Sequence, residues 1–280
     1  MSKVIICANQ KGGVAKSTSV VNLGIGLANK GKRVLVIDND PQGSLTEALG
    51  YPQPDKLEIT LANVMEWVLN EDDYDLKAGI LHHEEGIDLM PANIELSGVE
   101  TSLVGIMSSE TTLREYIESV RDDYDYILVD CSPNLGQLTL NALVAADEVI
   151  IPVQAAYLPI KGLEQLLKTI SRVKRKMNPK LHIMGILITM VDYRTVYAKE
   201  ITEVLYEHYG SSIHIFDDVI PLSVRAAEAS AEGVSIYKYD GKGKGVILVI
   251  MVLIEFCVLI NATLPWLERK TETPPRVRKI

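Results

Sequence analysis

The segment at residues 9–18, which reads NQKGGVAKST, has the residue types of a phosphate-binding loop. It follows an apolar run and precedes a stretch with helical spacing, so its backbone N–H groups and the positive end of the helix would face an anion. Lys16 would then reach the outer phosphates of a nucleotide, and the hydroxyl of Ser17 could bind Mg²⁺. The strict pattern G-x-x-x-x-G-K-[ST] is not met, because Gln10 and Ala15 stand where its glycines belong. The alternative interpretation is a Gly-Gly turn beside two surface lysines.

Three aspartates at the ends of apolar runs favour a site for a magnesium–nucleotide complex. Residues 34–37 lead into Asp38 and Asp40, and residues 126–129 lead into Asp130. Because ligands bind at the carboxyl ends of parallel strands, these carboxylates would lie beside the phosphate loop, where they could hold the water shell of the metal. Aspartate also commonly ends strands and begins turns, which is the structural alternative for each residue. Together the three residues favour the metal–nucleotide interpretation.

The elements that must position these residues are continuous apolar runs separated by helix-like stretches. The expected strands are 4–8, 34–37, 87–90, 126–129, 149–153 and 182–188. The expected helices are 17–29, 112–121, 137–146, 158–176 and 198–209. Residues 50–55 and 71–75 are expected to be solvated surface. Continuous apolar strands interleaved with helices predict an α/β fold, in which a doubly wound, mostly parallel sheet carries helices on both faces, as in P-loop NTPases.

The composition is that of an acidic globular protein. The 280 residues carry 28 Lys and Arg against 37 Asp and Glu, which gives a net charge of −9 at pH 7. Hydrophobic residues at 47% and charged residues at 23% exclude a disordered, collagen-like or disulfide-stapled chain. The three cysteines lie far apart without C-x-x-C spacing, and no secretory signal is recognisable, so a cytoplasmic location is expected. With this charge, contact with DNA would need a local basic patch.

Several motifs together resemble the ParA/Soj family of partition ATPases, which belongs to the deviant Walker A group of P-loop proteins. They are KGGVAKST at 11–18, DNDPQGSLT at 38–46, YDYILVDCSPNLG at 124–136, TMVDYR at 189–194 and VIPLSVRAAEAS at 219–230. The motifs fall in the order and spacing of the family, from about residue 3 to about residue 245. The Asp-Pro-Gln-Gly sequence after the second strand favours partition proteins over the MinD branch.

This resemblance implies a slow, partner-stimulated ATPase with ATP and Mg²⁺ as cofactors. Lys11, the extra lysine of the deviant motif, would reach the phosphates of a second subunit and neutralise charge that builds up in phosphoryl transfer. Lys16 would hold the β- and γ-phosphates, and Asp40 would position the attacking water. Asp130 would support Mg²⁺ together with Ser17. The residues implied to line the nucleotide are Lys11, Gly12, Gly13, Val14, Ala15, Lys16, Ser17 and Thr18, with Pro221 and Ser223 beside the adenine.

Two of these positions depart from the family pattern. Ser223 replaces the usual Asn, which affects one contact with the base. Ala15 replaces the usual Gly, and we expect its methyl group to be tolerated only if the backbone there keeps φ negative.

The resemblance also implies partners. ATP would close a homodimer, the dimer would bind DNA without sequence preference and associate with the nucleoid, and a ParB-like protein would stimulate hydrolysis. Arg194 and Arg225 match positions at which dimers of the family touch DNA, although solvated arginines or salt bridges are the alternative. Lys168, Arg172 and Arg175 share one helix face, which could follow a phosphate backbone or could simply be solvated.

The C-terminal segment departs from the family pattern, so we divide the chain into an ATPase domain at 1–245 and an atypical hydrophobic tail at 246–280. Three interpretations of the tail compete: an altered or frameshifted gene end, a membrane segment, and a buried C-terminal element. A membrane role would indicate a positioning ATPase of MinD type instead. A nucleotide-dependent transcriptional regulator is the third functional class.

Overall fold

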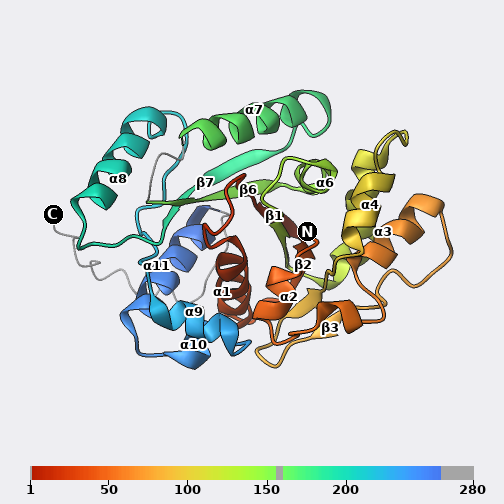
Figure 1. Cartoon of the computed structure of the whole chain (residues 1–280), viewed down its shortest axis with the longest axis horizontal. Coiled ribbons are helices and arrows are strands. Elements are labelled where there is room, and N and C mark those ends of the chain that lie inside the picture. Colours follow the sequence, from red (N-terminus) through yellow and green to blue (C-terminus); the bar gives the residue numbers. More distant parts are fainter. Residues whose placement is uncertain (1, 156–159, 260–280) are drawn as a thin grey trace.

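The computed structural model describes residues 2–155 and 160–259, and it builds them around a twisted sheet with helices on both faces (Figure 1). Within these residues the sheet has seven strands in the order β3-β4-β2-β5-β1-β6-β7. The strands are β1 (Lys3–Cys7), β2 (Val34–Asn39), β3 (Leu81–His82), β4 (Asp88–Met90), β5 (Tyr126–Cys131), β6 (Glu148–Gln154) and β7 (His182–Thr189). All neighbours pair in parallel except β3, which runs antiparallel to β4 at the edge. The predicted doubly wound α/β fold is confirmed.

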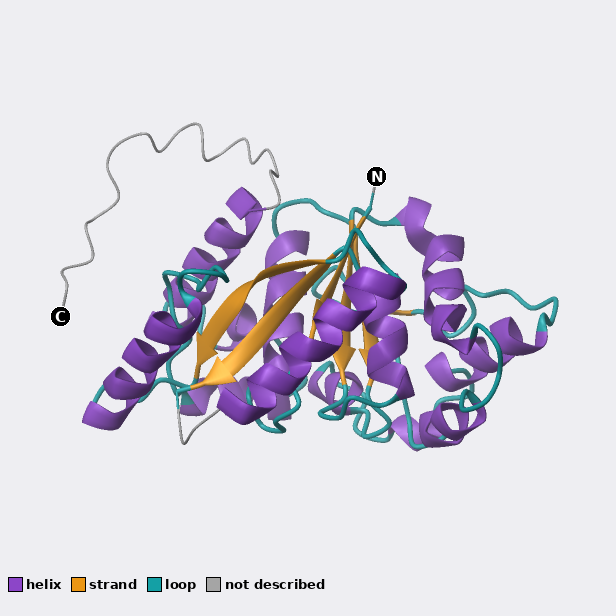
Figure 2. Ribbon diagram, turned by 90° about the horizontal axis from the view of Figure 1, so that it is seen from above, coloured by secondary structure: helices purple, strands orange, loops and turns teal. Residues whose placement is uncertain are grey.

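Helices lie on both faces of the sheet (Figure 2), and an apolar cluster on each face buries the central strands. Because side chains alternate along a strand, Val4 and Ile6 of β1 join one cluster while Ile5 and Cys7 join the other. The helices that contribute to the first cluster are α3 (Leu61–Asn70), α4 (Leu96–Ser102), α5 (Thr112–Val120), α6 (Gln137–Ala145), α7 (Ile160–Lys176) and α8 (Val196–Tyr209). Those of the second cluster are α1 (Lys16–Ala28), α2 (Ser44–Ala48) and α11 (Lys244–Leu259). Beside them lie α9 (Val224–Ala231) and α10 (Ile236–Tyr239).

The expected strands and helices are present, and their ends differ from the observed ends by at most about two residues, apart from residues 158 and 159, which lie outside the described residues. The strand β3, the helices α2, α3, α4, α9 and α10, and the 3₁₀ turns η1 (Pro54–Lys56), η2 (Ser109–Thr111) and η3 (Arg121–Asp123) were not predicted. One surface prediction is wrong in part. Pro54 is buried, because its ring packs against the tight turn at Gly43.

The carboxyl ends of the central strands bring the sequence motifs together. In the register of β1, β2 and β5, Cys7 and Asp38 both lie opposite Asp130. The phosphate loop leaves β1 at this same edge and enters α1. The parallel register therefore places the loop and two of the three aspartates at one site.

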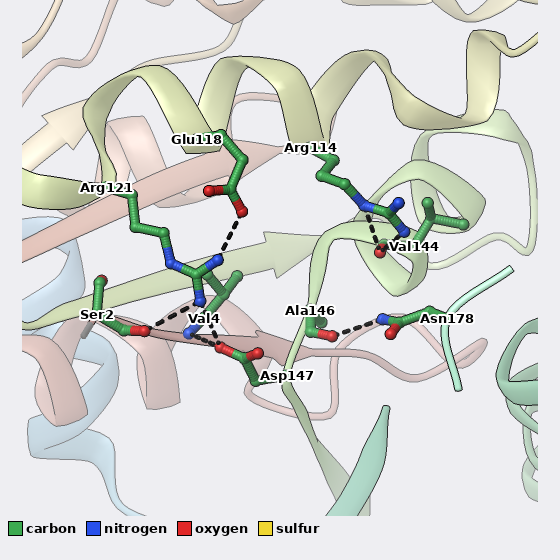
Figure 3. A network of polar contacts seen from close by, with 9 residues as sticks. All are labelled: Ser2, Val4, Arg114, Glu118, Arg121, Val144, Ala146, Asp147 and Asn178. Atoms are coloured by element: carbon green, nitrogen blue, oxygen red, sulfur yellow. Dashed lines mark hydrogen bonds and ion pairs between the residues drawn. The ribbon is translucent and has the colours of Figure 1, made fainter. Parts of the chain in front are cut away.

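The amino ends of the strands are fixed by a polar network around Arg121 (Figure 3). Its guanidinium donates hydrogen bonds to the backbone oxygen of Ser2 and to Asp147, each at 3.1 Å, and to Glu118 at 2.6 Å. Asp147 also accepts from the backbone N–H of Val4 at 2.9 Å. The network ties the starts of β1 and β6 to the end of α5, at the edge opposite the phosphate loop.

The described part of the hydrophobic C-terminal segment is the helix α11, which packs on α1 (Figure 1). Val252, Leu253, Phe256 and Cys257 are buried in the same cluster as α1 and the sheet. The carboxylate of Glu255 accepts hydrogen bonds from His214 Nε2 at 2.7 Å and from the backbone N–H of residue 217 at 3.0 Å. The one acidic side chain of this helix is therefore partnered where the helix meets the segment that follows α8.

Among the three interpretations of the tail, residues 244–259 fit the buried C-terminal element. No helix among the described residues is long and apolar enough to span a membrane. Residues 260–280 lie outside the described residues.

Phe256→Ala tests whether α11 belongs to the folded core. The ring of Phe256 is fully buried, so its loss should lower the free energy of unfolding by about 3–5 kcal/mol. Leu259→Ala, near the exposed end of the same helix, is the control and should change that free energy by no more than about 0.5 kcal/mol. Urea denaturation of both variants makes the comparison. Equal, small effects would mean that α11 does not contribute to the core.

Candidate functional site

The phosphate loop is held in place by side chains at the ends of neighbouring strands. The amide of Asn9 donates to the backbone oxygen of Pro152 in β6 at 2.6 Å, and its carbonyl oxygen accepts from the backbone N–H of Lys11 at 3.0 Å. The hydroxyl of Thr189, the last residue of β7, donates to the backbone oxygen of Val14 at 3.0 Å. These contacts fix the two ends of the loop to the rigid sheet, as precise anion binding requires.

Two residues of the loop adopt the left-handed backbone conformation. Gly13 has φ +69°, and Ala15, the N-cap of α1, has φ 63°. The expectation that Ala15 keeps φ negative is therefore wrong, because the turn into α1 requires this geometry whichever residue occupies it. A non-glycine residue there costs about 1–2 kcal/mol. The backbone oxygen of Ala15 accepts from both the N–H and the hydroxyl of Ser19, at 3.0 and 2.7 Å, which stabilises the turn.

The two lysines of the loop point in different directions. Lys16 is buried, and its Nζ folds back toward the backbone oxygen of Lys11 at 3.5 Å. This position places a cation on the inner side of the loop, where the phosphates of a nucleotide would lie. The side chain of Lys11 is exposed and reaches Gln154 Oε1 at the end of β6, at 3.3 Å. Lys11 is therefore accessible to a second molecule, while the ammonium group of Lys16 stays inside its own loop.

Asp130, the next-to-last residue of β5, is a fully buried carboxyl group beside the start of α1. It accepts a hydrogen bond from the side chain of Ser17, and burial raises its pKa to about 7 although that bond and Lys16 oppose the change. Its Oδ1 atom has no hydrogen-bond partner among the described residues. A buried, unpartnered carboxylate oxygen next to a hydroxyl group fits the oxygen ligands and bound waters that Mg²⁺ prefers.

The site has no dense cluster of metal ligands of its own. No group of three or more His, Cys, Asp or Glu side chains within the described residues could hold a metal ion. Mg²⁺ is usually bound by one or two protein groups together with substrate phosphates and water, so this arrangement fits a metal that arrives with a nucleotide.

Asp38 is a buried carboxyl group and one of the three aspartates that the sequence analysis placed beside the phosphate loop, where they could hold the water shell of the metal. Its Oδ2 accepts from the backbone N–H and the hydroxyl of Thr46, at 2.8 and 2.7 Å, while the Thr46 hydroxyl oxygen also accepts from Ala92. Burial, followed by the nearby charge of Asp130, raises the pKa of Asp38 well above its ordinary value. Asp38 therefore anchors the segment that carries Asp40.

Asp40 follows β2 and is nearly buried. Its backbone N–H donates to Asp38 Oδ1 at 3.3 Å, and its own Oδ1 accepts from the backbone N–H of Gln42 at 3.0 Å. Its second carboxylate oxygen takes part in none of the hydrogen bonds found among the described residues. The carboxylate is thus oriented by its own turn and keeps an acceptor for water.

Pro221 and Ser223, the residues expected beside the adenine, lie near the first turn of α1. Pro221 and Ser223 line an apolar cavity of about 70 Å³ together with Ala15 and Thr18. The inner wall of this cavity includes Phe256 of α11. The Ser223 hydroxyl oxygen accepts from the backbone N–H of residue 226 at 3.3 Å and so caps α9, which leaves its O–H free to donate.

Of the two arginines expected to contact DNA, Arg194 lies in the loop after β7 and Arg225 lies in the first turn of α9. A bridge between Val191 and Pro221 joins the segments that precede them. Arg194 makes two hydrogen bonds of 2.8 Å to the carboxylate of Asp192, and Arg225 lies 3.3 Å from Glu228. Both guanidinium groups are largely exposed. Each therefore has a local carboxylate partner, a feature that the sequence analysis gave as the alternative.

Three residues that shape the site were not among the predicted site residues. Asp38 was expected beside the metal but received no role from the family resemblance, and Asn9 and Thr189 act through backbone contacts. A polar residue directly at the end of an apolar strand is the signal that could have found all three.

The protonation of Asp130 gives a prediction for the protein without nucleotide or metal. Its pKa is about 7 in the folded protein and 3.8 ordinarily, so between these values the folded state holds a proton that the unfolded chain has released. The unfolding free energy should therefore fall as pH rises, by up to about 1.4 kcal/mol per pH unit. Asp130→Asn removes this term and should gain about 2 kcal/mol relative to the parent between pH 5 and pH 7. Urea denaturation in EDTA at both pH values measures it, and parallel pH profiles of the two proteins would contradict the assignment.

Comparison with known families identifies the phosphate-loop domain. The family model described as "AAA domain" matches residues 2–183. Soj, the sporulation initiation inhibitor protein of Bacillus subtilis, is 42% identical over 246 residues, which cover 88% of this chain and 94% of that protein. The chromosome partitioning protein ParA of Caulobacter vibrioides is 39% identical over 245 residues, which cover 87% of this chain and 89% of that protein.

A solved structure shows the same fold with a nucleotide. The Mycobacterium smegmatis protein described as cobyrinic acid a,c-diamide synthase, with a bound ATP analogue and magnesium, is 35% identical. It superposes with a TM-score of 0.80 over 92% of this chain and 94% of that protein. The identity to Soj extends over most of both chains and agrees with the geometry of the loop, the aspartates and the two lysines. This chain belongs to the ParA/Soj family of P-loop ATPases.

Proposed function

We propose that this protein is a partition ATPase that binds ATP and Mg²⁺, dimerises on ATP, binds DNA without sequence preference and moves a plasmid or chromosome. The observation that supports it best is the different placement of the two lysines of the phosphate loop. Lys16 is buried at the phosphate position, whereas Lys11 extends outward at the same edge of the sheet. An outward lysine beside a phosphate site is suited to act on a second subunit.

Each polar group of the site has a role in this proposal. Lys16 and the backbone N–H groups of the loop hold the β- and γ-phosphates. The hydroxyl of Ser17, which Asp130 orients, would ligate Mg²⁺, and Asp130 would accept from a water of the metal. Mg²⁺ would neutralise charge on the phosphates when bound. Asp40, held by its own turn, orients the attacking water.

The second subunit completes the charge balance. Negative charge spreads over the oxygens of the transferred phosphoryl group, and a cation that enters from outside stabilises it. Lys11 of the facing subunit supplies that cation, so a lone subunit hydrolyses ATP slowly. A ParB-like partner would then act on the dimer, which is the species with both lysines in place.

DNA binding follows from the same assembly. A chain with net charge −9 is repelled by DNA except at a local basic patch. Arg194, in the loop after β7, and Arg225, in the first turn of α9, would supply such a patch, and a dimer would present two copies of it. The gain is that of bivalency and needs no new kind of contact. ATP-dependent dimerisation would thus switch DNA binding on and place the protein on the nucleoid.

Lys11→Ala should separate nucleotide binding from assembly. The variant should keep ATP binding, because its own Lys16 is unchanged, but it should lose the ATP-dependent dimer and hydrolysis. Lys16→Ala is the matched comparison and should lose ATP binding itself, because it removes the buried cation on the inner side of the loop. Fluorescent-nucleotide titration and sedimentation velocity measure the two properties. A normal ATP-dependent dimer of the Lys11 variant would overturn the assignment of this residue.

Arg225→Glu should weaken binding to any DNA sequence and leave the ATP-dependent dimer intact. If two arginines from each subunit neutralise four phosphates, the log–log salt slope should be about −3.6 and should become shallower in the variant. Arg33→Glu is the control, because Arg33 is also exposed and paired with one carboxylate, Asp125, but lies just before β2 at the opposite edge of the sheet. Anisotropy of a labelled duplex across a salt titration makes the measurement. Equal affinity of both variants and the parent would place the DNA contact elsewhere.

A further inference from the structure

A groove lies on the sheet face opposite α1, where α6 runs between α7 and α4 (Figure 1). Its volume is about 710 Å³. Leu135, Leu140 and Val173 give it an apolar lining, and Val104 and Met177 extend the apolar surface. Val104 is 65% exposed. This groove, called the α4–α6–α7 groove below, is separate from the phosphate loop and its lysines.

The surface beside the groove has more exposed apolar side chains than a solvated surface requires. After α4 the chain exposes Ile106 and Met107, and Met107 is 91% exposed. They follow Val104 closely in the chain, although they do not line the groove themselves. Contiguous exposed apolar residues at a groove are typical of sites that bind another protein.

The wall formed by α7 is basic and unpaired. Arg172 and Lys176 line the groove, and Lys168 and Arg175 are exposed on the same helix. None of these four side chains forms an ion pair with a carboxylate in the part of the chain that the structure describes. Glu100 of α4 also lines the groove, so the two cations Arg172 and Lys176 face one carboxylate there and the balance of charge is positive. In a chain of net charge −9, this positive balance beside apolar side chains complements an acidic occupant.

The floor of the groove is connected to the nucleotide site. Leu135 lies two residues after Pro133. Pro133 lies close to the phosphate loop, since a Cβ placed on Gly12 would be 3.9 Å from the Cβ of Pro133. In addition, the amide of Asn39, at the end of β2, donates to the backbone oxygen of Leu138 in the first turn of α6 at 3.0 Å. An occupant of the groove would therefore touch a segment that contacts both the loop and the strand end next to Asp38.

We propose that the α4–α6–α7 groove is the docking site of a partner protein, which inserts an acidic amphipathic helix. The apolar side of that helix packs on Leu140, Val173 and Val104, and its acidic side faces Arg172 and Lys176. The apolar lining favours a protein over DNA, because phosphates gain nothing from exposed valine and methionine side chains. A helix laid in a groove by regularly spaced apolar anchors is a common mode of recognition.

A designed peptide tests this proposal without nucleotide, so that failure of the ATPase proposal would leave the result interpretable. The probe is a labelled helical peptide with leucines at i, i+3, i+4 and i+7 and glutamates at the other positions. Its counterpart carries lysines in place of the glutamates. The double variant Arg172→Glu/Lys176→Glu is compared with Lys174→Glu/Lys180→Glu, which makes the same charge change with exposed residues outside the groove.

The glutamate peptide should bind the parent and the Lys174/Lys180 variant equally and should bind the Arg172/Lys176 variant about tenfold or more weakly. The lysine peptide should show the reverse preference. Val104→Asp should also weaken binding of the glutamate peptide, because the groove loses an apolar wall. Circular dichroism establishes that each variant is folded.

Three results would overturn the proposal. One is equal weakening in both double variants, which would indicate attraction by net charge alone. Another is loss of duplex DNA binding, with peptide binding unchanged, in the Arg172/Lys176 variant, which would make α7 a DNA contact. The third is self-association of the parent that this variant abolishes, which would make the occupant a second copy of the chain.

Discussion

Two fully buried carboxyl groups lie opposite one another at the ends of β2 and β5, and the rest of the site is arranged around them. A carboxylate in the interior is costly unless it is paired or hydrogen-bonded, and two of them side by side raise that cost. Two hydrogen bonds from Thr46 offset the cost of burying Asp38. Asp130 receives one hydrogen bond from Ser17, and its Oδ1 has no partner among the described residues. Asp38 therefore stabilises the segment after β2, whereas Asp130 keeps an acceptor oxygen for a ligand at the phosphate loop.

The same constraint explains why the loop is attached so firmly to the sheet. Lys16 is the cation nearest to Asp130, and its position is useful only if the loop cannot drift away from β5. Asn9 ties the start of the loop to β6, and Thr189 ties Val14 to β7. With these anchors the turn into α1 has no freedom to relax, so Ala15 adopts a positive φ that a glycine would adopt more easily.

Much of this arrangement could be predicted from the sequence because it depends on short-range patterns. Apolar runs that end in aspartate give both the strand and the edge at which the carboxylate lies, and the order of the motifs then gives the fold. The sign of φ at Ala15 could not be predicted from residue type, because alanine is normally excluded from that region and the turn overrides its preference. The burial of α11 could not be predicted either. Its sequence has no clear polar face. Only the packing of Phe256 in the cluster that α1 forms with the sheet shows which side of the helix is covered.

The two faces of the sheet carry different tasks, and the strand ends connect them. On the face of α1, the phosphate loop and the cavity beside Pro221 and Ser223 form one continuous site, with α11 behind it. On the other face, α6 begins directly after the segment that leaves Asp130, and Asn39 joins its first turn to β2. A buried hydrogen bond is expensive to leave unmade, so the bond from Asn39 to Leu138 holds the start of α6 against the end of β2 that carries Asp38.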